Sequence, residues 1–379
     1  HRQNSIWKIT KKLKLKVSVI IVSYNCKAFL DYCVQSVIKA LDNIDGEIIV
    51  FDNSSSDGTV EFIESKNYNL RLIKSENNIG FSKANNKAAK FAKGEFLFFL
   101  NPDTIIPEDV FHQFFKFKLD DLGIFGFRMI DGKGKFLKES KRNLPNINII
   151  LKKLLGFDSK YYSSLDEFDS GSVDVLCGAN MIIKKSIYDK VGGFNEEYFM
   201  FGEDIEICYE TKKIGMNNFY SATSTLIHFK GESTKNDINY LRNFYGAMRI
   251  YFKNIFSSNQ FLLTTILLIS KFLVLFKSIM PKKQIVEIKT EKNILIGEKP
   301  INKLNDLFGE ISLVNEIDSS QDRCNIIFDS NYLSFKQIIS HIDNLQSRKK
   351  IKFWFLPEDY SYVIGSSGMN QKGNIIFFD

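Results

Sequence analysis

The sequence predicts an α/β protein with an open, mostly parallel sheet flanked by helices, followed by a second, smaller α/β domain. Short apolar, partly β-branched runs alternate with helix-length segments between residues 17 and 100. Polar residues follow these runs directly, which is typical of the carboxyl ends of parallel strands, where such sheets bind ligands. The alternation resumes after residue 285, which predicts the second domain.

Each element is predicted from its local pattern. Val17–Tyr24 is rich in β-branched residues and bounded by charge and by Asn25, which indicates a buried parallel strand. Apolar periodicity predicts a helix from Ala28 to Leu41, and Ser56 and Asp57 can cap another that ends near Glu64. Further strands of the first domain are expected at 47–51, 70–73, 95–100, 173–176 and 225–229, and further helices at 82–93 and 203–214. A hairpin turn is expected at Asp131-Gly132.

These patterns divide the chain into four segments. A basic N-terminal segment covers 1–16, and the main domain covers 17–255. An amphipathic helical linker follows at 256–284, and a small Rossmann-like domain occupies 285–379. Strands in this last domain are expected at 293–297, 311–315, 325–329 and 351–355.

Composition narrows the class of protein. Hydrophobic residues at 44% and charged residues at 25% are ordinary for a globular chain and exclude wholesale disorder. The 51 Lys and Arg outnumber the 44 Asp and Glu, and the net charge of +7 suits an anionic partner. Five scattered cysteines without a C-x-x-C pair argue against disulfides or structural zinc and favour a reducing compartment. Nucleic-acid binding has only the charge and interleaved aromatic residues in its favour and is not expected.

Three acidic segments could carry chemistry. Asp52 ends a predicted strand and could hold a nucleobase and ribose, although the same loop could simply cap a helix. Asp103, in Asn101-Pro102-Asp103-Thr104, could bind Mg²⁺ or Mn²⁺ together with a diphosphate. The alternative is that this segment is a plain strand-to-helix turn. Asp204 opens a predicted helix, where the helix dipole favours an ionised carboxylate that could accept a proton. His228 by itself is more often structural than a metal ligand.

The order of these pieces is more specific than any one of them. The series Ser23-Tyr24-Asn25, Asp52-Asn53-Ser54, Asn78-Ile79-Gly80-Phe81…Asn85-Asn86, Asn101-Pro102-Asp103, Cys177-Gly178-Ala179-Asn180, Gly202-Glu203-Asp204 and His228 occurs in one order. Over roughly residues 15–255 it resembles the inverting family 2 glycosyltransferases of the GT-A fold, particularly the rhamnosyltransferase-like branch that builds bacterial surface glycans.

The resemblance implies a role for each matching residue. Asp204 would be the general base, and Asp103 and His228 would bind Mg²⁺ or Mn²⁺. Gly178, Ala179, Asn180 and Glu203 would form the sugar and acceptor pocket. The nucleotide-sugar would contact Ser23, Tyr24, Asn25, Asp52, Asn53, Asn78, Gly80, Asn86 and Asn101.

The implied reaction is inverting transfer of a sugar from a UDP- or dTDP-sugar to a hydroxyl of a glycan or lipid-diphosphate-linked glycan. Two departures favour a different class, a non-catalytic nucleotide-sugar-binding or scaffold protein that kept the fold. Many relatives have an acid at the position of Asn101, and Glu210 stands where the helix usually carries Arg. A processive synthase is disfavoured because its Gln-x-x-Arg-Trp motif is absent.

Phe261–Met280 contains 14 apolar residues in 20 but also Lys271 and Lys277. A charge near the middle of a span is costly, so we expect either an interfacial helix or an amphipathic helix packed on the protein. The basic residues at 8–16, 271–283 and 346–350 would face anionic lipid in the first case. The basic N-terminal segment precedes no apolar core of the kind a signal peptide needs. We therefore expect a cytoplasmic protein, bound peripherally to the inner face of the cytoplasmic membrane if the helix is interfacial.

Overall fold

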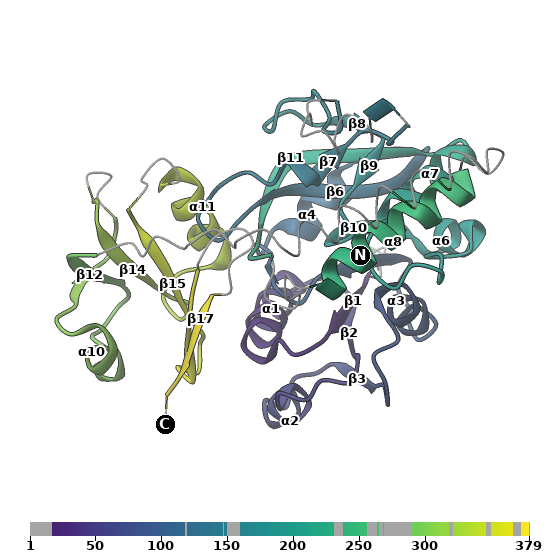
Figure 1. The fold of residues 1–379 in the computed structure, drawn as a ribbon. Helices are drawn as coiled ribbons and strands as arrows, with labels where there is room; N and C mark the ends of the chain where they lie inside the picture. The colour runs from purple at the N-terminus through teal and green to yellow at the C-terminus, as the bar shows by residue number, and fades with distance from the viewer. Residues whose placement is uncertain are drawn as a thin grey trace, which may run out of the picture.

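A computed structural model describes most of the chain. The described residues are 17–117, 120–146, 148–149, 160–230, 238–255, 264, 268, 290–317, 321–345, 350–366 and 373–378. They form a large mixed sheet and a smaller C-terminal sheet that lie side by side, with helices α1 and α11 between them (Figure 1).

The first half of the large sheet is parallel. Its strands run in the order β3 (Arg71–Lys74), β2 (Gly46–Asp52), β1 (Val17–Ser23) and β4 (Phe96–Leu100). The connecting helices are α1 (Lys27–Ala40), α2 (Thr59–Ser65) and α3 (Phe81–Ala89). β1 is buried along its whole length, because helices cover both faces of a sheet of this kind.

The second half of the sheet is mixed. β10 is antiparallel to both β4 and β6, β6 is parallel to β11, and β5 and β8 pair antiparallel with β11. These strands are β5 (Thr104–Ile105), β6 (Leu122–Ile130), β8 (Gly171–Val173), β10 (Asn180–Lys184) and β11 (Asn217–His228). A separate two-stranded sheet consists of β7 (Lys141–Arg142) and β9 (Val175–Leu176), preceded by the short 3₁₀ helix η1 (Lys138–Ser140).

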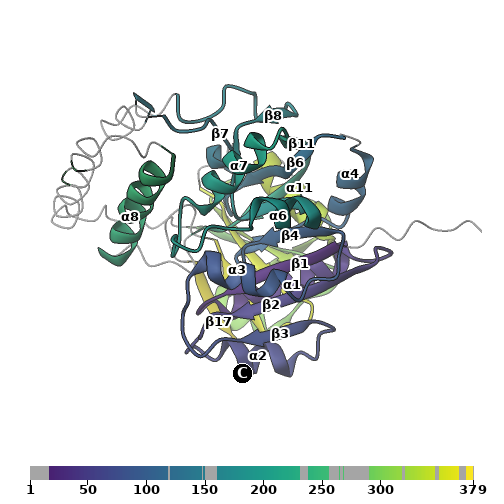
Figure 2. The same ribbon diagram turned by 90° about the vertical axis from the view of Figure 1, so that its right-hand side faces the viewer.

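Helices complete the layers around the large sheet. Figure 2 views the molecule from the side on which α3, α6 and α7 lie. α1, α2 and α4 share one hydrophobic cluster with the sheet, and α3, α6 and α7 share the cluster on the other face. The helices of this half are α4 (Val110–Lys116), α6 (Lys185–Val191), α7 (Glu203–Lys213) and α8 (Ile238–Ile255).

The C-terminal sheet begins as a parallel sheet and ends antiparallel. Its order is β13 (Ser312–Val314), β12 (Lys292–Ile296), β14 (Cys324–Asp329), β15 (Lys352–Leu356), β16 (Tyr362–Gly365) and β17 (Asn374–Phe377). The first four strands are parallel, and α10 (Asn302–Phe308) and α11 (Phe335–Leu345) accompany them. This confirms that the chain has a mostly parallel sheet followed by a second α/β unit.

Several local expectations differ from the structure. The strand expected at 173–176 is two short strands, β8 and β9, in different sheets, and the strand expected at 225–229 is only the end of the twelve-residue β11. β11 is rich in polar residues and its register with β6 shifts between Ser221 and Thr225, so its strand character depends on pairing rather than on alternation. The turn at Asp131-Gly132 is confirmed, since Gly134 N–H donates to Asp131 O.

The membrane expectation falls mainly on residues outside the description. Of residues 261–280 the structure describes only 264 and 268, and it describes none of residues 8–16. The interfacial helix therefore stays a prediction. Among the helices that the structure does describe, none has the length and apolar character needed to cross a bilayer.

The two sheets share one hydrophobic cluster. It contains α1 residues such as Phe29 and Tyr32 together with residues of the C-terminal sheet such as Phe328 and Phe355. Tyr32 also contacts Ser330 through its hydroxyl, with the two oxygens 2.7 Å apart. The C-terminal domain is therefore packed against the main domain through a common core.

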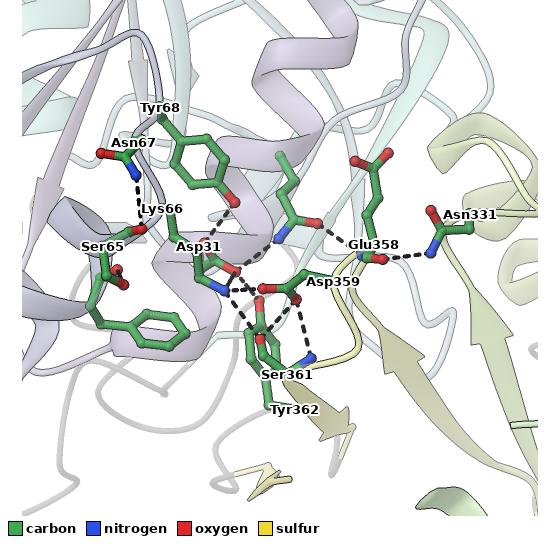
Figure 3. A network of polar contacts seen from close by, with 12 residues as sticks. Asp31, Ser65, Lys66, Asn67, Tyr68, Asn331, Glu358, Asp359, Ser361 and Tyr362 are labelled. Carbon is green, nitrogen blue, oxygen red and sulfur yellow. Dashed lines mark hydrogen bonds and ion pairs between the residues drawn. The ribbon is translucent and has the colours of Figure 1, made fainter. Parts of the chain in front are cut away.

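Polar contacts accompany this core. Asp31 of α1 is fully buried and accepts hydrogen bonds from Tyr362 Oη (2.7 Å), Tyr68 Oη (2.9 Å) and Gln35 Nε2 (2.8 Å) (Figure 3). Lys66 lies 3.8 Å from the Asp31 carboxylate and pairs with Asp359. Burial raises the pKa of Asp31, an effect that the two tyrosine hydroxyls and Lys66 oppose.

A second buried charge joins the same two parts of the chain. Arg128 of β6 is 1% exposed, and its guanidinium bonds both oxygens of Asp343 on α11 at 2.8 and 3.1 Å. Glu167 accepts a further bond from Arg128 at 3.0 Å. A buried guanidinium needs such partners because an unpaired charge is costly in the interior.

We expect Asp31→Ala to lower the free energy of unfolding by about 3 kcal/mol, because three donors lose a common buried acceptor. The matched change Asp359→Ala removes the exposed carboxylate of the same network and should cost less than about 1 kcal/mol. Denaturant unfolding of both variants measures the difference. Equal losses would contradict the importance given to the buried carboxylate.

Candidate active site

The site begins where the strands of the large sheet end. Asp103 follows β4 directly before the two-residue strand β5, and His228 is the last residue of β11. β5 and β11 pair antiparallel, with His228 opposite Thr104, and Phe229 N–H donates to Asp103 O at 2.9 Å. This short ladder brings together two residues 125 positions apart in the chain.

The side chains of this pair face each other. His228 Nε2 lies 3.2 Å from Asp103 Oδ1 and 3.4 Å from Asn101 Nδ2, and the Asp103 and His228 side chains are 2% and 7% exposed. Asp103 Oδ1, Asn101 Oδ1 and His228 Nδ1 are buried and have no hydrogen-bond partner in the described structure. Buried acceptors without partners are costly, and a divalent cation is one way to satisfy them.

The donor set fits Mg²⁺ or Mn²⁺ only as a partial shell. Both ions prefer carboxylate oxygen, whereas imidazole more often binds Zn, Cu, Fe or Ni, so Asp103 fits these ions better than His228 does. No group of three or more His, Cys, Asp or Glu side chains with metal-binding geometry occurs within the described ranges. The remaining ligands would therefore have to come from water and from phosphate oxygens of a bound nucleotide.

Asp204 lies in the first turn of α7 and has a partner that the sequence patterns did not indicate. Arg142 Nη2 is 2.5 Å from Asp204 Oδ2, and Gly178 N–H donates to the same oxygen at 3.1 Å. No described residue forms a hydrogen bond with Asp204 Oδ1. Arg142 comes from β7, in a stretch where periodicity is weak, so only the pairing of β7 with β9 places it there.

The loop 177–180 connects Asp204 with the Asp103 pair. Asn101 N–H donates to Ala179 O at 3.1 Å, and Gly178 contacts Asp204 on the other side. A Cβ on Gly178 would lie 3.3 Å from Asp204 Cβ, so glycine allows this close approach. Asn180 is buried in β10 and donates to Phe127 O at 2.9 Å, which indicates a role within the sheet.

Glu203 stands beside Asp204 and is 6% exposed. Its Oε2 has no hydrogen-bond partner in the described structure. Burial, with the neighbouring Asp204 charge, raises the pKa of Glu203 to about 8. Glu203 can therefore hold a proton near neutral pH and donate a hydrogen bond. Asp204, by contrast, pairs with the guanidinium of Arg142.

The loop after β2 is held mainly by its own side chains. Asp52 accepts from Ser23 Oγ at 3.1 Å and from the backbone and hydroxyl of Ser55 at 2.9 and 2.6 Å. Asn25 Oδ1 accepts from Ser56 N–H at 2.7 Å. These contacts hold the loop itself, whereas α2 begins after Gly58 without a side-chain cap, so the helix-capping alternative is not borne out; contact of Asp52 with a base stays a prediction. Tyr24 is 38% exposed, so its side chain is accessible to a ligand.

Asn53 joins this loop to the next one. Its side chain bonds Asn78 Oδ1 at 2.9 Å and accepts from Ile79 N–H at 2.9 Å. Gly80 has φ +84°, and a Cβ there would lie 2.6 Å from Phe199 O. The close approach that requires glycine is thus made by Phe199; an approach by the nucleotide is still only predicted.

Asn86 is used within the protein. Its Nδ2 donates to Phe194 O at 2.8 Å and to Glu196 Oε1 at 3.0 Å, and its Oδ1 accepts from Phe194 N–H at 3.0 Å. These bonds tie α3 to the segment between α6 and α7. The structure therefore favours a positioning role for Asn86 over direct contact with the nucleotide-sugar.

The strand order and the polar residues at the strand ends are those of an α/β domain that binds ligands at the carboxyl edge of its sheet. Within that class, residues 18–192 match the model of Glycosyl transferase family 2, so the chain carries a domain of this family. The family match ends before α7 and does not extend to the C-terminal sheet.

Curated relatives agree with this assignment. A low-salt glycan biosynthesis hexosyltransferase of Haloferax volcanii is 25% identical over 55% of this chain and 66% of its own length. The rhamnosyltransferase WbbL of Escherichia coli K12 is 26% identical over 56% of this chain and 83% of its own. An N-acetylglucosaminyl-diphospho-decaprenol L-rhamnosyltransferase of Mycobacterium tuberculosis is 24% identical, over 58% and 78%.

A solved structure is also similar. The Staphylococcus aureus TarS 1-349 complex with UDP-GlcNAc aligns with 68% of this chain and 71% of its own, at 21% identity and a TM-score of 0.44. The assignment to the family does not depend on it, because the family match covers Ser23 and Asp52 at their strand ends and Asp103 between β4 and β5.

We expect wild-type stability to fall as pH rises from about 4.5 to about 8, relative to the Glu203→Gln variant. Over that window the unfolded chain has released the Glu203 proton while the folded chain still holds it, so rising pH favours unfolding. The variant has no such proton. Denaturant unfolding at several pH values measures the difference, and Glu197→Gln, at an exposed carboxylate, is the control that should run parallel to wild type. A constant offset between wild type and Glu203→Gln would refute the shifted titration.

Proposed function

We propose that this chain transfers a sugar from a UDP- or dTDP-sugar to a hydroxyl group of a glycan or lipid-diphosphate-linked glycan, with inversion at the anomeric carbon. The family match and the named relatives support a hexosyltransferase of surface glycan synthesis. The observation that carries the proposal is the buried Asp103–His228 pair, linked through the loop 177–180 to a carboxylate held by Arg142.

Asp204 is the proposed general base. Arg142 and Gly178 occupy its Oδ2 and so fix the direction of the carboxylate, and Oδ1 remains available for the acceptor hydroxyl. As the acceptor oxygen bonds to the anomeric carbon, Asp204 takes its proton and the bond from that carbon to the diphosphate oxygen breaks. A single displacement of this kind inverts the anomeric configuration. Glu203, protonated near neutral pH, is placed to donate a hydrogen bond to a sugar or acceptor hydroxyl.

Asp103 and His228 are the proposed ligands of Mg²⁺ or Mn²⁺. Such an ion would stabilise the negative charge that develops on the departing nucleoside diphosphate. Asn101, within 3.4 Å of His228, replaces an acid found in many relatives and leaves the pair with a single negative charge. The net charge of +7 is consistent with an anionic donor and with an acceptor displayed at an anionic membrane surface.

Replacing Asp204 with Asn should lower turnover by about 10²- to 10⁴-fold, because the general base is lost, while nucleotide binding is retained. The assay is release of UDP or dTDP from a panel of nucleotide sugars in Mn²⁺ with lipid extracts as acceptors. Glu210→Gln, on the exposed side of the same helix, is the control and should keep wild-type turnover. If Asp204→Asn turns over at the wild-type rate, Asp204 is not the general base. If wild type releases neither UDP nor dTDP, the non-catalytic alternative is favoured.

Asp103→Asn should abolish the part of nucleotide binding that depends on Mn²⁺, because the amide has lost the anionic charge that holds the ion. Titration calorimetry of UDP with Mn²⁺ and with a chelator measures this part directly. Binding without metal should be the same in variant and wild type, which makes it the internal control. If Mn²⁺ strengthens UDP binding equally in both proteins, Asp103 does not bind the metal.

A further inference from the structure

The ladder that joins Asp103 to His228 is too short to fix their geometry alone. β5 contains two residues and pairs only with β11 among the described strands. Ile105 and Ile227, opposite each other in this ladder, are fully buried in the cluster shared with the C-terminal domain. The support for the pair therefore comes from side chains packed behind the ladder.

Phe229 is central to that packing. It follows His228 directly, is 4% exposed, and its N–H is bonded to Asp103 O. Its ring makes edge contacts with Phe29 of α1, at 5.1 Å between centroids, and with Phe355 of β15, at 5.0 Å. Gly132 closes a third side, since a Cβ there would lie 2.8 Å from Phe229 Cδ1. The ring is enclosed by both domains and has little freedom to move.

We propose that Phe355 of the C-terminal domain is a positioning residue for His228, acting through the Phe229 ring. The inference rests on the proposed function, in which His228 binds the metal. The inference gives the C-terminal domain a part in the transfer reaction, because side chains of this domain pack behind the end of β11 and hold it against β5.

The place of Phe355 is itself well fixed. It is fully buried, lies 6.0 Å from the Tyr32 ring and 5.8 Å from the Phe328 ring, and belongs to a strand in the middle of its sheet. The carboxyl ends of β14 and β15 are covered by α1, because Ser330 contacts Tyr32 and Glu358 N–H donates to Gln35 Oε1 at 3.3 Å. The edge where a Rossmann-like sheet usually binds ligands is thus used for docking.

The neighbouring residue offers a matched control. Leu356 is also fully buried on β15, but it packs on the opposite face with Leu295, Trp354 and Val363. Phe355→Leu and Leu356→Ala both remove buried apolar atoms from the same strand. Only the first removes the ring that contacts Phe229.

The experiment has two readouts on the full chain. The first is the imidazole NMR signal of His228, which is one of only four histidines and can be assigned with His228→Gln. The second is the Mn²⁺ concentration that half-saturates UDP binding. Phe355→Leu should move the His228 signal and raise that concentration by about tenfold or more, because displacements near 1 Å are costly in a pre-organised site. Leu356→Ala should lower the melting temperature without either change.

The outcomes separate the two proposals. If wild type shows no Mn²⁺-dependent UDP binding but Phe355→Leu still moves the His228 signal, the metal role fails and the positioning contact stands. If Phe355→Leu leaves both readouts as in wild type, or if Leu356→Ala changes them equally, the positioning proposal is overturned. Phe229→Leu is a second variant that should reproduce the effect of Phe355→Leu through the same contact.

Discussion

Burial of helix α1 between two sheets is the constraint on which the rest of the structure depends. A helix on the surface of an α/β domain normally keeps one polar face in water. In α1, eleven residues are buried, and Asp31, Gln35 and Ser36 are among them. Each needs a partner away from water: Asp31 bonds Tyr362 and Tyr68, Gln35 bonds Glu358 N–H, and Ser36 bonds Ile106 N–H.

These bonds connect α1 to three parts of the molecule that matter for chemistry. Its N-terminus follows Asn25, in the loop proposed for the nucleotide. Its middle contacts the Asp103 segment, where Cys33 Sγ lies 3.5 Å from Thr104 Oγ1. Its remaining face meets the C-terminal sheet through Tyr32. Displacing the second sheet would expose a helix that also supports the candidate site, so the two domains form one structural unit.

Electrostatics divides the site into two regions of different character. Asp103 and His228 present one carboxylate and one imidazole in a buried recess, with lone pairs left for a ligand. Asp204 and Glu203 are adjacent acids, but the guanidinium of Arg142 bonds directly only to Asp204. Burial, and after it the neighbouring Asp204 charge, raises the pKa of Glu203, so Glu203 retains its proton to higher pH. These two acids, adjacent in the chain, thus have different partners.

Much of the fold could be predicted from local pattern. β1, β2 and β4 are apolar runs ended by polar residues, and this periodicity also indicated where Asp52 and Asp103 would lie. The order of motifs along the chain indicated the family whose model residues 18–192 match. β11 and the split of 173–176 into two strands were missed, because their strand character comes from pairing with distant segments.

The sequence by itself determined the parallel core, the family and the residues at the strand ends, because each depends on short-range periodicity and on motif order. Tertiary structure alone decided that Arg142 pairs with Asp204, that Asp31 bonds Tyr362, and that Phe355 packs against Phe229. These contacts join residues 62 positions apart or more, between elements whose own patterns fit many neighbours. These partners are selected only when entire helix and sheet faces pack together. Burial and strand pairing depend on the assembled surfaces, so the local sequence pattern does not indicate them.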